Sequence, residues 1–543
     1  MALARTRSVA LNGVRGRVIE VEAHLGPGLP RTILVGLPDA SLSEARDRCR
    51  AAVINSGASW PNRHLTVGLS PASVPKSGTS YDLSIALVIL AAAGVVPAAP
   101  LEDAVLLGEL ALDGRLRAVA GVLPATLAAA AAGYTRLLVP EANAAEAAVV
   151  DGVTVVPVRS LGHAVALLTG ADPPDDPPVA PLARSVDTWS GSQRVQGLDL
   201  SAVRGQAEAR RGVEVAAAGG HHLFLQGPPG AGKTMLAERL PGLLPDLGMA
   251  DSLEVSAVHS VAGGLAPELP LIVRPPFLEP HHTASAPSIV GGGGRVLRPG
   301  AMSLAHRGVL FMDEAPEFAA GILESLRQPL ESGEICIGRS GQTTTFPARF
   351  QLVLAANPCP CGFDWARSNR CECPPAAKRR YRDRISGPVR DRIDICLKVG
   401  PVRRHELRDD LAVVESSAVV RQRVEAARSR QLARYVGTPW RCNGDVPGPE
   451  MRTRWPVRTR VVSLLEEHSA EGRISARGVD RIIRLAWTLA DLHEHPRPDD
   501  SDVEQALLLR DTDSAVLAGG GRRRDTAAHL PLRPRAEDSE VVA

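Results

Sequence analysis

The sequence has no long hydrophobic segment and no strong excess of charge of either sign. Its longest apolar stretch, Leu83 to Val96, is too short to cross a bilayer, and no N-terminal segment has the charged, apolar and small-residue order of a signal peptide. We therefore expect a soluble, cytoplasmic protein with no membrane partner. The formal net charge is only +2, so composition by itself gives no reason to propose nucleic acid as a partner.

Cysteine is sparse, and the chain is long. With eight cysteines in a cytoplasmic protein, we expect thiols or metal ligands rather than disulfides. A length of 543 residues is too great for one hydrophobic core and indicates three or four domains. Hydrophobic residues make up 44% of the chain, which is enough for globular folding.

A glycine-rich segment in the middle of the chain fits the pattern GxxxxGK[ST]. It reads Gly227-Pro228-Pro229-Gly230-Ala231-Gly232-Lys233-Thr234. In such a loop the backbone N–H groups point at phosphates, the lysine reaches the same oxygens and the threonine hydroxyl binds Mg²⁺. An apolar run precedes the loop at residues 221–226, and a helical pattern follows it at residues 235–240. This context predicts a site for a nucleoside triphosphate.

A second apolar run, Val309 to Met312, ends in two carboxylates. We predict that it is a buried strand that delivers Asp313 to the metal and Glu314 to an attacking water. The loop pattern alone can arise by chance. The loop with its strand, its helix and the acidic strand predicts hydrolysis of the nucleotide.

The pattern along the chain predicts an α/β protein in five parts. They are an α+β domain over residues 1–170, a proline-rich linker over 171–194, a nucleotidase core with a mainly parallel sheet over 195–400, an all-α lid over 401–514 and a disordered tail over 515–543. The boundary at the linker rests on Asp172 to Pro181, where prolines lack backbone donors and fix φ.

Five further motifs occur in a fixed order along the chain. They are Gly205-Gln206, Pro280-His281-His282-Thr283, Asp313-Glu314-Ala315-Pro316-Glu317-Phe318, Ala356-Asn357-Pro358-Cys359-Pro360-Cys361-Gly362, and Ser386 to Asp394. With the phosphate loop, this set resembles the magnesium-chelatase-like AAA+ proteins of the YifB/ComM type, and the resemblance covers residues 1 to about 512. It implies a homo-hexameric ring ATPase that binds ATP and Mg²⁺ between subunits.

The resemblance also implies catalytic roles for three side chains. Asn357 would orient the water against the γ-phosphate; the alternative is a turn asparagine at the end of a strand. Arg392 would be the arginine finger that enters the neighbouring subunit's site, with Arg390 or Arg384 as the fallback. Arg477 would touch the γ-phosphate from within its own subunit, or it is a solvated helix arginine.

Two insertions extend the nucleotidase core. One lies between the phosphate loop and the acidic strand and contains Arg295; the other predicts a β-hairpin with arms at residues 334–338 and 343–346 and Arg339 at its tip. In the family that the chain resembles, both insertions face the central pore. Arg339 and Arg295 are therefore candidates for contacts to the backbone of a DNA strand.

Four cysteines lie close together in the sequence. They are Cys359, Cys361, Cys371 and Cys373. Four thiolates in a short loop suit a tetrahedral, structural Zn²⁺, although each C-x-C pair is tighter than the usual C-x₂-C and four reduced thiols are the alternative. His281 and His282 have no such partners nearby, so we interpret them as loop or interface histidines rather than metal ligands.

Part of the first domain resembles the Lon-type protease domain. The resemblance rests on Pro75-Lys76-Ser77-Gly78-Thr79-Ser80, on residues 108–114 and on residues 120–123. Ser80 stands at the place of the nucleophile, but Leu123 stands where that family has its activating lysine. Without a base the hydroxyl stays protonated, so we expect a catalytically inactive domain that is structural or binds a partner.

Three classes of function remain. The resemblance implies an ATP-driven DNA motor for branch migration or unwinding, acting in homologous recombination and natural transformation, with recombination proteins as partners. A protein-remodelling ATPase is the alternative. A magnesium-chelatase motor subunit is the third class, and the Lon-like domain and the cysteine loop argue against it because such subunits lack both.

Overall fold

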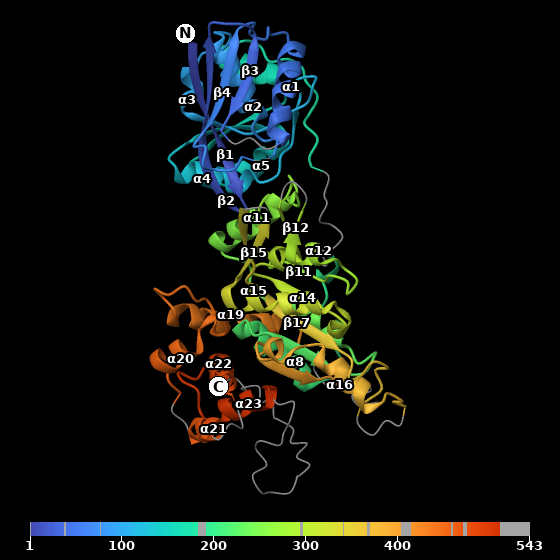
Figure 1. Cartoon of the computed structure of the whole chain (residues 1–543). Helices are drawn as coiled ribbons and strands as arrows, with labels where there is room; N and C mark the ends of the chain where they lie inside the picture. The colour runs from blue at the N-terminus through green and yellow to red at the C-terminus, as the bar shows by residue number, and fades with distance from the viewer. Residues whose placement is uncertain are drawn as a thin grey trace, which may run out of the picture.

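The computed structural model describes residues 2–36, 40–76, 78–182, 192–293, 297–339, 342–365, 370–402, 414–457, 460–470 and 475–510. The N-terminal domain, in blue, lies at one end of an elongated molecule, the nucleotidase core lies in the middle, and the last helices lie beside the core (Figure 1). Within these ranges no helix has the length and apolar character needed to cross a bilayer.

The N-terminal domain is built on a seven-stranded mixed sheet with the order β3-β4-β2-β1-β5-β8-β9. The strands are β1 (Ala2–Asn12), β2 (Arg15–Gly26), β3 (Arg31–Val35), β4 (His64–Ser70), β5 (Ala104–Leu106), β8 (Arg136–Pro140) and β9 (Thr154–Val158). The helices are α1 (Ala40–Asn55), α2 (Asp82–Ala92), α3 (Ala99–Glu102), α4 (Val122–Ala131), α5 (Ala144–Ala147) and α6 (Leu161–Thr169), and a small hairpin joins β6 (Glu109–Leu110) to β7 (Leu116–Arg117). The predicted mixture of strands and alanine-rich helices is confirmed.

The longest apolar run of the sequence forms α2. All but one of the residues of this helix are buried, so it is a core helix of the N-terminal domain.

The first part of the proline-rich linker lies along the N-terminal domain without regular secondary structure. The Arg159 guanidinium donates to the Asp176 carbonyl at 3.1 Å, and the Val179 N–H donates to the Glu141 carboxylate at 3.3 Å. The Ser160 hydroxyl donates to the Asp176 carboxylate. These bonds fasten the linker to the domain as far as Val179, and residues 183–191 lie outside the described part of the chain.

The core contains a five-stranded parallel sheet with the order β11-β14-β17-β10-β18. Its strands are β11 (Phe277–Leu278), β14 (Val309–Met312), β17 (Gln351–Ala356), β10 (Leu223–Gln226) and β18 (Ile395–Lys398). Alternate side chains of β17 enter two different apolar clusters, with Val353 in one and Leu352 in the other. The predicted parallel sheet with helices on both faces is therefore confirmed.

Helices and two short hairpins surround this sheet. The helices are α8 (Ala207–Gly219), α9 (Lys233–Ala237), α10 (Leu240–Leu243), α11 (Met249–Ala262), α12 (Ala286–Val290), α13 (Ala301–Leu304), α14 (Ala320–Ser325), α15 (Arg327–Ser332), α16 (Pro375–Asp383) and α17 (Gly387–Arg390). The predicted hairpin of the second insertion is confirmed as β15 (Glu334–Arg339) paired with β16 (Gln342–Pro347), and a smaller one pairs β12 (Gly291–Gly292) with β13 (Arg298–Pro299).

The described part of the C-terminal region is helical. It contains α19 (Ser417–Arg434), α20 (Gly448–Arg454), α21 (Arg460–Ala470), α22 (Ala476–Leu492) and α23 (Asp500–Arg510). Apolar side chains of these helices join the same buried cluster as α8 and one face of the parallel sheet. A buried ion pair, Arg481 to Asp394 at 2.9 Å, adds a polar link between α22 and the start of β18. The predicted tail over 515–543 lies outside the described residues.

Candidate active site

The phosphate loop connects the carboxyl end of β10 to the first residue of α9. Two glycines explain why the loop can follow this path. A side chain at Gly227 would place its Cβ 2.0 Å from the Val399 carbonyl oxygen, and Gly232 has a φ of +90° immediately before the helix. The loop therefore ends at the N-terminus of α9, where backbone N–H groups suit an anion.

Lys233 is the most constrained polar side chain of the loop. Its side chain is buried, and its ammonium group donates to the Gly227 carbonyl at 2.7 Å, to the Pro228 carbonyl at 3.0 Å and to Asn357 Oδ1 at 3.1 Å. Burial lowers the pKa of Lys233, and the nearby carboxylates of Asp313 and Glu314 oppose this shift. All three donors of the ammonium group are used, so a bound triphosphate would have to replace at least one of these acceptors.

The two predicted Mg²⁺ ligands lie side by side. The Thr234 hydroxyl donates to Asp313 Oδ2 at 2.8 Å, and Asp313 Oδ1 accepts the N–H of Glu314 at 2.8 Å. Both carboxylate oxygens of Asp313 are thereby fixed at the end of β14. A hydroxyl beside a carboxylate, next to a phosphate loop, is a donor set that fits Mg²⁺.

Glu314 has a left-handed backbone, with a φ of +49°, and its side chain is about half exposed. A non-glycine residue in this conformation is uncommon and is found preferentially at functional sites. The turn directs the chain away from the strand immediately after Asp313. The exposed carboxylate is accessible to water, as the predicted water-polarising base requires.

Sequence reasoning gave His282 no role at this site, yet the structure brings it to Glu314. His282 Nδ1 lies 3.4 Å from Glu314 Oε2, and the His282 ring lies against His281 with centroids 4.2 Å apart and edge-on to Phe318. The motif that begins at Pro280 therefore reaches the candidate base. The signal in the sequence was the motif itself, but nothing in its spacing connects it to a residue that lies 32 positions further along.

Gln206 joins the phosphate loop to the end of β18. Its amide donates to the Ala231 carbonyl and, at 3.2 Å, to the Gly400 carbonyl, and its own backbone is left-handed with a φ of +53°. Gln206 of the Gly205-Gln206 motif thus holds the phosphate loop against the end of β18. The sequence pattern alone did not indicate this role.

The predicted arginine finger is buried within its own chain. Arg392 forms an ion pair with Glu331, and its guanidinium donates to the Pro388 carbonyl at 2.5 Å. Arg384 and Arg390 are exposed; Arg384 pairs with Glu317 at 3.2 Å. In the free chain Arg392 is therefore neutralised, and it would have to leave Glu331 to reach a second subunit.

Arg477, predicted to act within its own subunit, is exposed, and its positive charge acts on Arg392. Burial lowers the pKa of Arg392, and the positive charge of Arg477 is the next contributor. Among the described residues no hydrogen bond or ion pair connects Arg477 with the phosphate loop. The structure thus groups Arg477 with the candidate finger.

Three family models match most of the chain. Residues 199–407 match magnesium chelatase, subunit ChlI; residues 21–143 match subunit ChlI of Mg-chelatase; and residues 414–510 match the C-terminal part of magnesium chelatase subunit ChlI.

Full-length relatives agree with these models. An uncharacterised protein of Mycobacterium tuberculosis is 49% identical over 515 residues, which cover 94% of this chain and 99% of the relative. The protein YifB of Escherichia coli is 39% identical, with 95% and 99% covered, and the competence protein ComM of Haemophilus influenzae is 39% identical, with 94% and 98% covered. The chain belongs to the magnesium-chelatase ChlI family, with YifB and ComM. It is therefore an AAA+ ATPase of the ComM-like type, a family that uses ATP and Mg²⁺.

A shorter similarity connects this ChlI-family ATPase with proteases. The Lon protease of Rhizobium meliloti is 30% identical over 196 residues, which cover 33% of this chain and 24% of the protease. In the structure Ser80 is partly exposed, whereas Leu123 is fully buried in the first turn of α4. Leu123, which we predict to stand in place of the protease lysine, is thus an apolar core residue.

The four clustered cysteines of this ATPase meet in space. Cys359 Sγ lies 3.3 Å from Cys361 Sγ and 3.7 Å from Cys371 Sγ, and the ligand atoms of all four, with Cys373, lie within 4.8 Å of one another. Four sulfurs at about 2.3 Å from a tetrahedral zinc would be about 3.8 Å apart, so the arrangement fits Zn²⁺. The Phe363 N–H lowers the pKa of the Cys361 thiol to about 7, whereas burial raises the pKa of the Cys359 thiol to about 12, so a bound metal would itself have to stabilise the thiolate of Cys359.

The cysteine loop packs directly on the phosphate loop. Gly362, with a φ of +80°, lies so close to Pro229 that a Cβ at this position would be 2.6 Å from the proline ring. The N–H of Gly362 donates to the Cys359 carbonyl at 2.9 Å, which ties this contact to the first cysteine. A metal bound by the cysteines would therefore brace one wall of the nucleotide site.

A second group of metal-ligand types does not suit a metal. His493, His495 and Asp502 place their ligand atoms within 4.8 Å of one another. However, an Arg211 N–H lies 2.8 Å from His493 Nε2, so this nitrogen must accept, and the proton stands on Nδ1, which donates to Asp502 at 2.8 Å. A metal would need the lone pair of that Nδ1. The group is a hydrogen-bonded link between α8 and the loop before α23.

The pore candidates are only partly within the described residues. Arg339 ends β15, and its backbone pairs with Gln342, while its side chain lies outside the description. Arg295 lies wholly outside it.

We predict that Glu314→Gln binds ATP but hydrolyses it at least about 100-fold more slowly, because the amide cannot take a proton from the attacking water. Steady-state ATPase assays with Mg²⁺ and direct nucleotide-binding measurements check this. Lys233→Ala should instead lose ATP binding. The matched control is Glu317→Gln, which makes the same change at a nearby exposed carboxylate. Turnover by Glu314→Gln at close to the wild-type rate would refute the assignment.

We predict about one Zn²⁺ per chain, and loss of the metal when Cys359 or Cys371 is replaced by serine. Metal analysis of protein purified without chelators measures this. Because Gly362 contacts Pro229, the same variants should also raise the KM for ATP, whereas Cys336→Ser, at an exposed cysteine outside the cluster, should change neither quantity. Zinc-free wild-type protein would contradict the prediction.

Proposed function

We propose that this ChlI-family ATPase is a hexameric motor that moves DNA strands through its ring, in branch migration or unwinding during homologous recombination. The observation that carries the proposal is the 39% identity to a competence protein over nearly the full length of both chains. Competence is the uptake of DNA, and integration of the incoming strand requires a motor that extends a heteroduplex.

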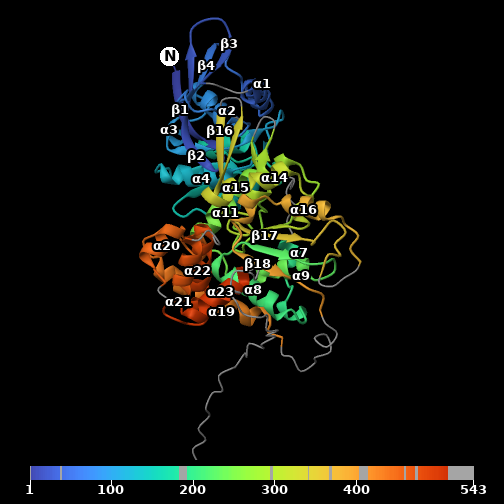
Figure 2. The same ribbon diagram turned by 60° about the horizontal axis from the view of Figure 1, so that its bottom comes forward.

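The hairpin β15–β16 supports a polymer as substrate. Its six paired positions, from Glu334↔Pro347 to Arg339↔Gln342, form a continuous arm that ends at a basic residue. In Figure 2 the yellow hairpin rises from the core beside the N-terminal domain, away from the nucleotide-binding edge of the sheet. A cation at the end of an arm suits contacts to phosphates, which carry no sequence information.

The proposed hydrolysis uses the groups at the strand ends. Lys233 would exchange its carbonyl acceptors for phosphate oxygens, while Thr234 and Asp313 would hold a Mg²⁺ that neutralises charge on the phosphates. Glu314 takes the proton of the attacking water, and His282, 3.4 Å away, keeps the carboxylate aimed at that water. Asn357, already bonded to Lys233, orients the same water.

We further propose that Arg392 and Arg477 both act on the nucleotide of the neighbouring subunit. The electrostatic influence of Arg477 on Arg392 supports this, because two cations that act on each other can act on one triphosphate. The role within the same subunit that the sequence predicts for Arg477 is the alternative. Exchange of Glu331 for a γ-phosphate would make release of Arg392 depend on a loaded neighbour.

Protein remodelling is the second candidate. The similarity to a Lon protease, an enzyme that acts on protein chains, favours it. The buried Leu123 at the place of the lysine leaves a remodelling role without cleavage.

We predict that Arg392→Ala leaves ATP binding by a subunit largely intact and lowers hydrolysis by the ring about 1,000-fold, as for other arginine fingers. Arg477→Ala should resemble it if both act across the interface. Rings mixed from Arg392→Ala and Glu314→Gln subunits should recover part of the activity, because some interfaces then combine an intact finger with an intact base. No recovery in rings whose mixed composition is verified by mass spectrometry would contradict the shared site.

We predict that single-stranded or branched DNA stimulates the ATPase, with little sequence preference, and that the stimulation falls steeply with salt. Arg339→Ala should lower the DNA-dependent increment and the rate of branch migration on a synthetic four-way junction. Arg497→Ala, an exposed arginine between α22 and α23, is the matched control. Stimulation by unfolded protein but by no DNA at any salt concentration would replace the DNA motor with protein remodelling.

A further inference from the structure

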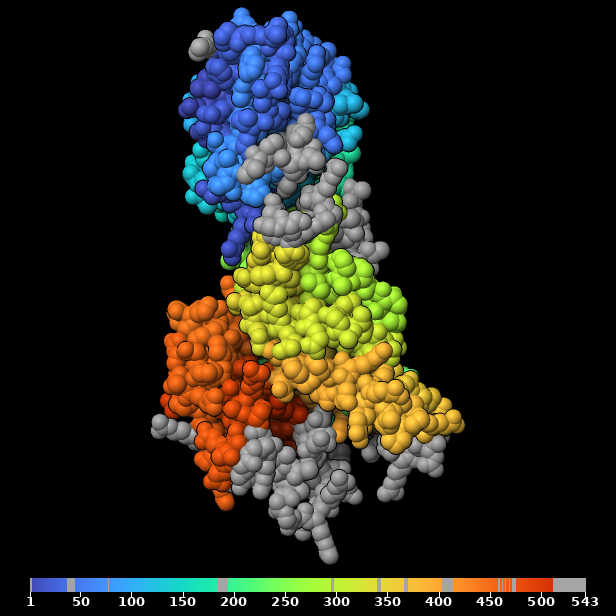
Figure 3. All heavy atoms as spheres, in the orientation of Figure 1, coloured from blue at the N-terminus to red at the C-terminus, as the bar shows by residue number. Residues whose placement is uncertain are grey.

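The turn of the first N-terminal hairpin rests on the pore hairpin of the core. Asn12 Nδ2 donates to the Thr343 carbonyl at 3.3 Å, and the Thr344 hydroxyl donates to Asn12 Oδ1 at 2.7 Å. A Cβ at Gly13 would lie 2.6 Å from the Thr345 carbonyl oxygen, so the two backbones are too close for any side chain at position 13. Three consecutive residues of β16 are therefore in contact with two residues of the N-terminal domain. Figure 3 shows dark-blue atoms of the N-terminal hairpin meeting the yellow atoms of the core at a narrow neck.

The N-terminal hairpin is a stiff arm. Strands β1 and β2 pair without interruption from Ala2↔Leu25 to Asn12↔Arg15, which leaves Gly13 and Val14 as a two-residue turn. Gly13 has a φ of +64°, as expected for glycine at the first central position of such a turn. Val14, partly buried, packs against the apolar cluster that contains residues of β15. The continuously paired β1–β2 hairpin, with Val14 at its apolar tip, can therefore hold the β15–β16 hairpin in one position.

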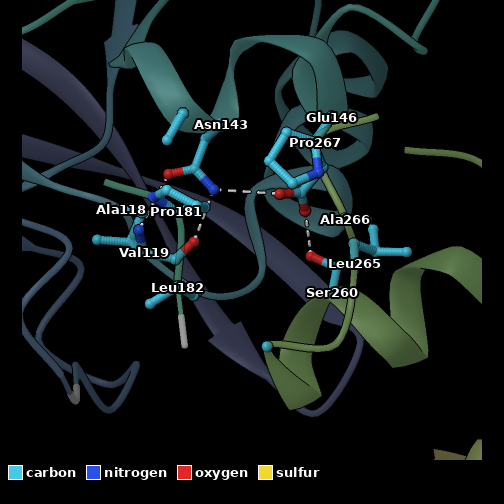
Figure 4. A pocket seen from close by; sticks show the side chains of 12 residues that line it. Ala118, Val119, Asn143, Glu146, Pro181, Leu182, Ser260, Leu265, Ala266 and Pro267 are labelled. Atoms are coloured by element: carbon cyan, nitrogen blue, oxygen red, sulfur yellow. Dashed lines mark hydrogen bonds between the residues drawn. The ribbon is translucent and has the colours of Figure 1, made fainter. Parts of the chain in front are cut away.

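A second contact fastens the same domain to α11, next to the first insertion. The Gly121 N–H donates to the Ser260 carbonyl at 3.1 Å, and the Ser260 hydroxyl donates to the Glu146 carboxylate. Glu146 also accepts the Leu123 N–H at 2.8 Å and the Asn143 amide at 3.2 Å, so this buried carboxylate has three donors (Figure 4). Burial raises the pKa of Glu146, and the donors with the N-terminus of α4 oppose that shift.

This second contact lies at the first turn of α4, where the protease fold would carry its lysine. Here the Gly121 N–H, at the start of α4, and the Glu146 carboxylate bind Ser260 of the core instead. The N-terminal domain is thus fixed at one point to α11 and at another point to β16. Two separated contacts restrict the orientation of the domain more than either contact alone.

We propose that the N-terminal domain is a positioning module for the pore hairpin, in which Asn12 and Gly13 set the place from which Arg339 meets the DNA strand. The inference rests on the proposed function, because it assigns the domain a part in that substrate contact. Asn12 is a positioning residue: it touches the hairpin and not the nucleotide site. Loss of its two hydrogen bonds would let the hairpin tilt, and DNA would meet a less ordered cation.

The test uses the full-length ring and four variants at the contact, of which Gly13→Ala is the fourth. Asn12→Ala and Thr344→Val remove hydrogen bonds, while Thr344→Ser keeps the hydroxyl that donates to Asn12. Asn55→Ala is the matched control, because the Asn55 amide donates only to Leu112 within the N-terminal domain, at 2.7 Å. The measurements are the basal ATPase, the DNA concentration that gives half-maximal stimulation, and hydrogen exchange of the β16 amides.

For Asn12→Ala and Thr344→Val we expect the half-stimulating DNA concentration to rise about two- to tenfold, the range that corresponds to one or two hydrogen bonds. The β16 amides should exchange faster in both. The kcat and KM for ATP without DNA should be unchanged in Asn12→Ala, and Thr344→Ser and Asn55→Ala should behave as wild type. Gly13→Ala, which forces the backbones apart, should act in the same direction as Asn12→Ala.

Two outcomes would overturn the inference. Unchanged exchange of β16 in Asn12→Ala would show that the contact does not hold the hairpin. Faster exchange with an unchanged DNA response would show that the position of the hairpin does not matter to DNA. A wild-type ring that DNA does not stimulate would refute the proposed DNA motor instead, and the exchange measurement would still report on the contact.

Discussion

The buried ammonium group of Lys233 is the charge around which the candidate ATPase site is arranged. It lies where the carboxyl ends of three parallel strands meet, and each strand supplies something to it: β10 the carbonyls of the phosphate loop, β17 the amide of Asn357, and β14 the opposing charge of Asp313. A cation this deeply buried must have acceptors on every donor. The Gly227 and Pro228 carbonyls and Asn357 supply these acceptors within the chain, in positions from which triphosphate oxygens can take over.

Much of this could be predicted from the sequence because the residues concerned are close in the chain or sit in regular elements. The strands that carry Asp313 and Asn357 were predicted at their observed bounds, and so were the arms of the pore hairpin to within one residue. The contact of His282 with Glu314 could not be predicted, because it joins two loops whose approach depends on tertiary packing. The same holds for the close packing of Gly362 on Pro229, because this contact involves no charged group and no periodic sequence pattern.

Roles that depend on a neighbour were the hardest to predict. The motif around Arg477 predicts a nucleotide-sensing arginine, but only the fold shows that its charge acts on Arg392. The N-terminal domain gives a similar lesson. Sequence reasoning predicts an inactive domain from Leu123, and this stays a prediction. The buried carboxylate that accepts a hydroxyl from the core required the structure.

The fastened linker has a consequence for how the two halves of the molecule stay together. The last linker bond described is at Val179, so twelve residues, 180–191, separate it from α7 (Ser192–Val195). Twelve residues span at most about 43 Å. After any separation, the domain and the core remain at an effective concentration of about millimolar to each other. Contacts too weak to hold two free proteins together are therefore sufficient to keep this domain on the core.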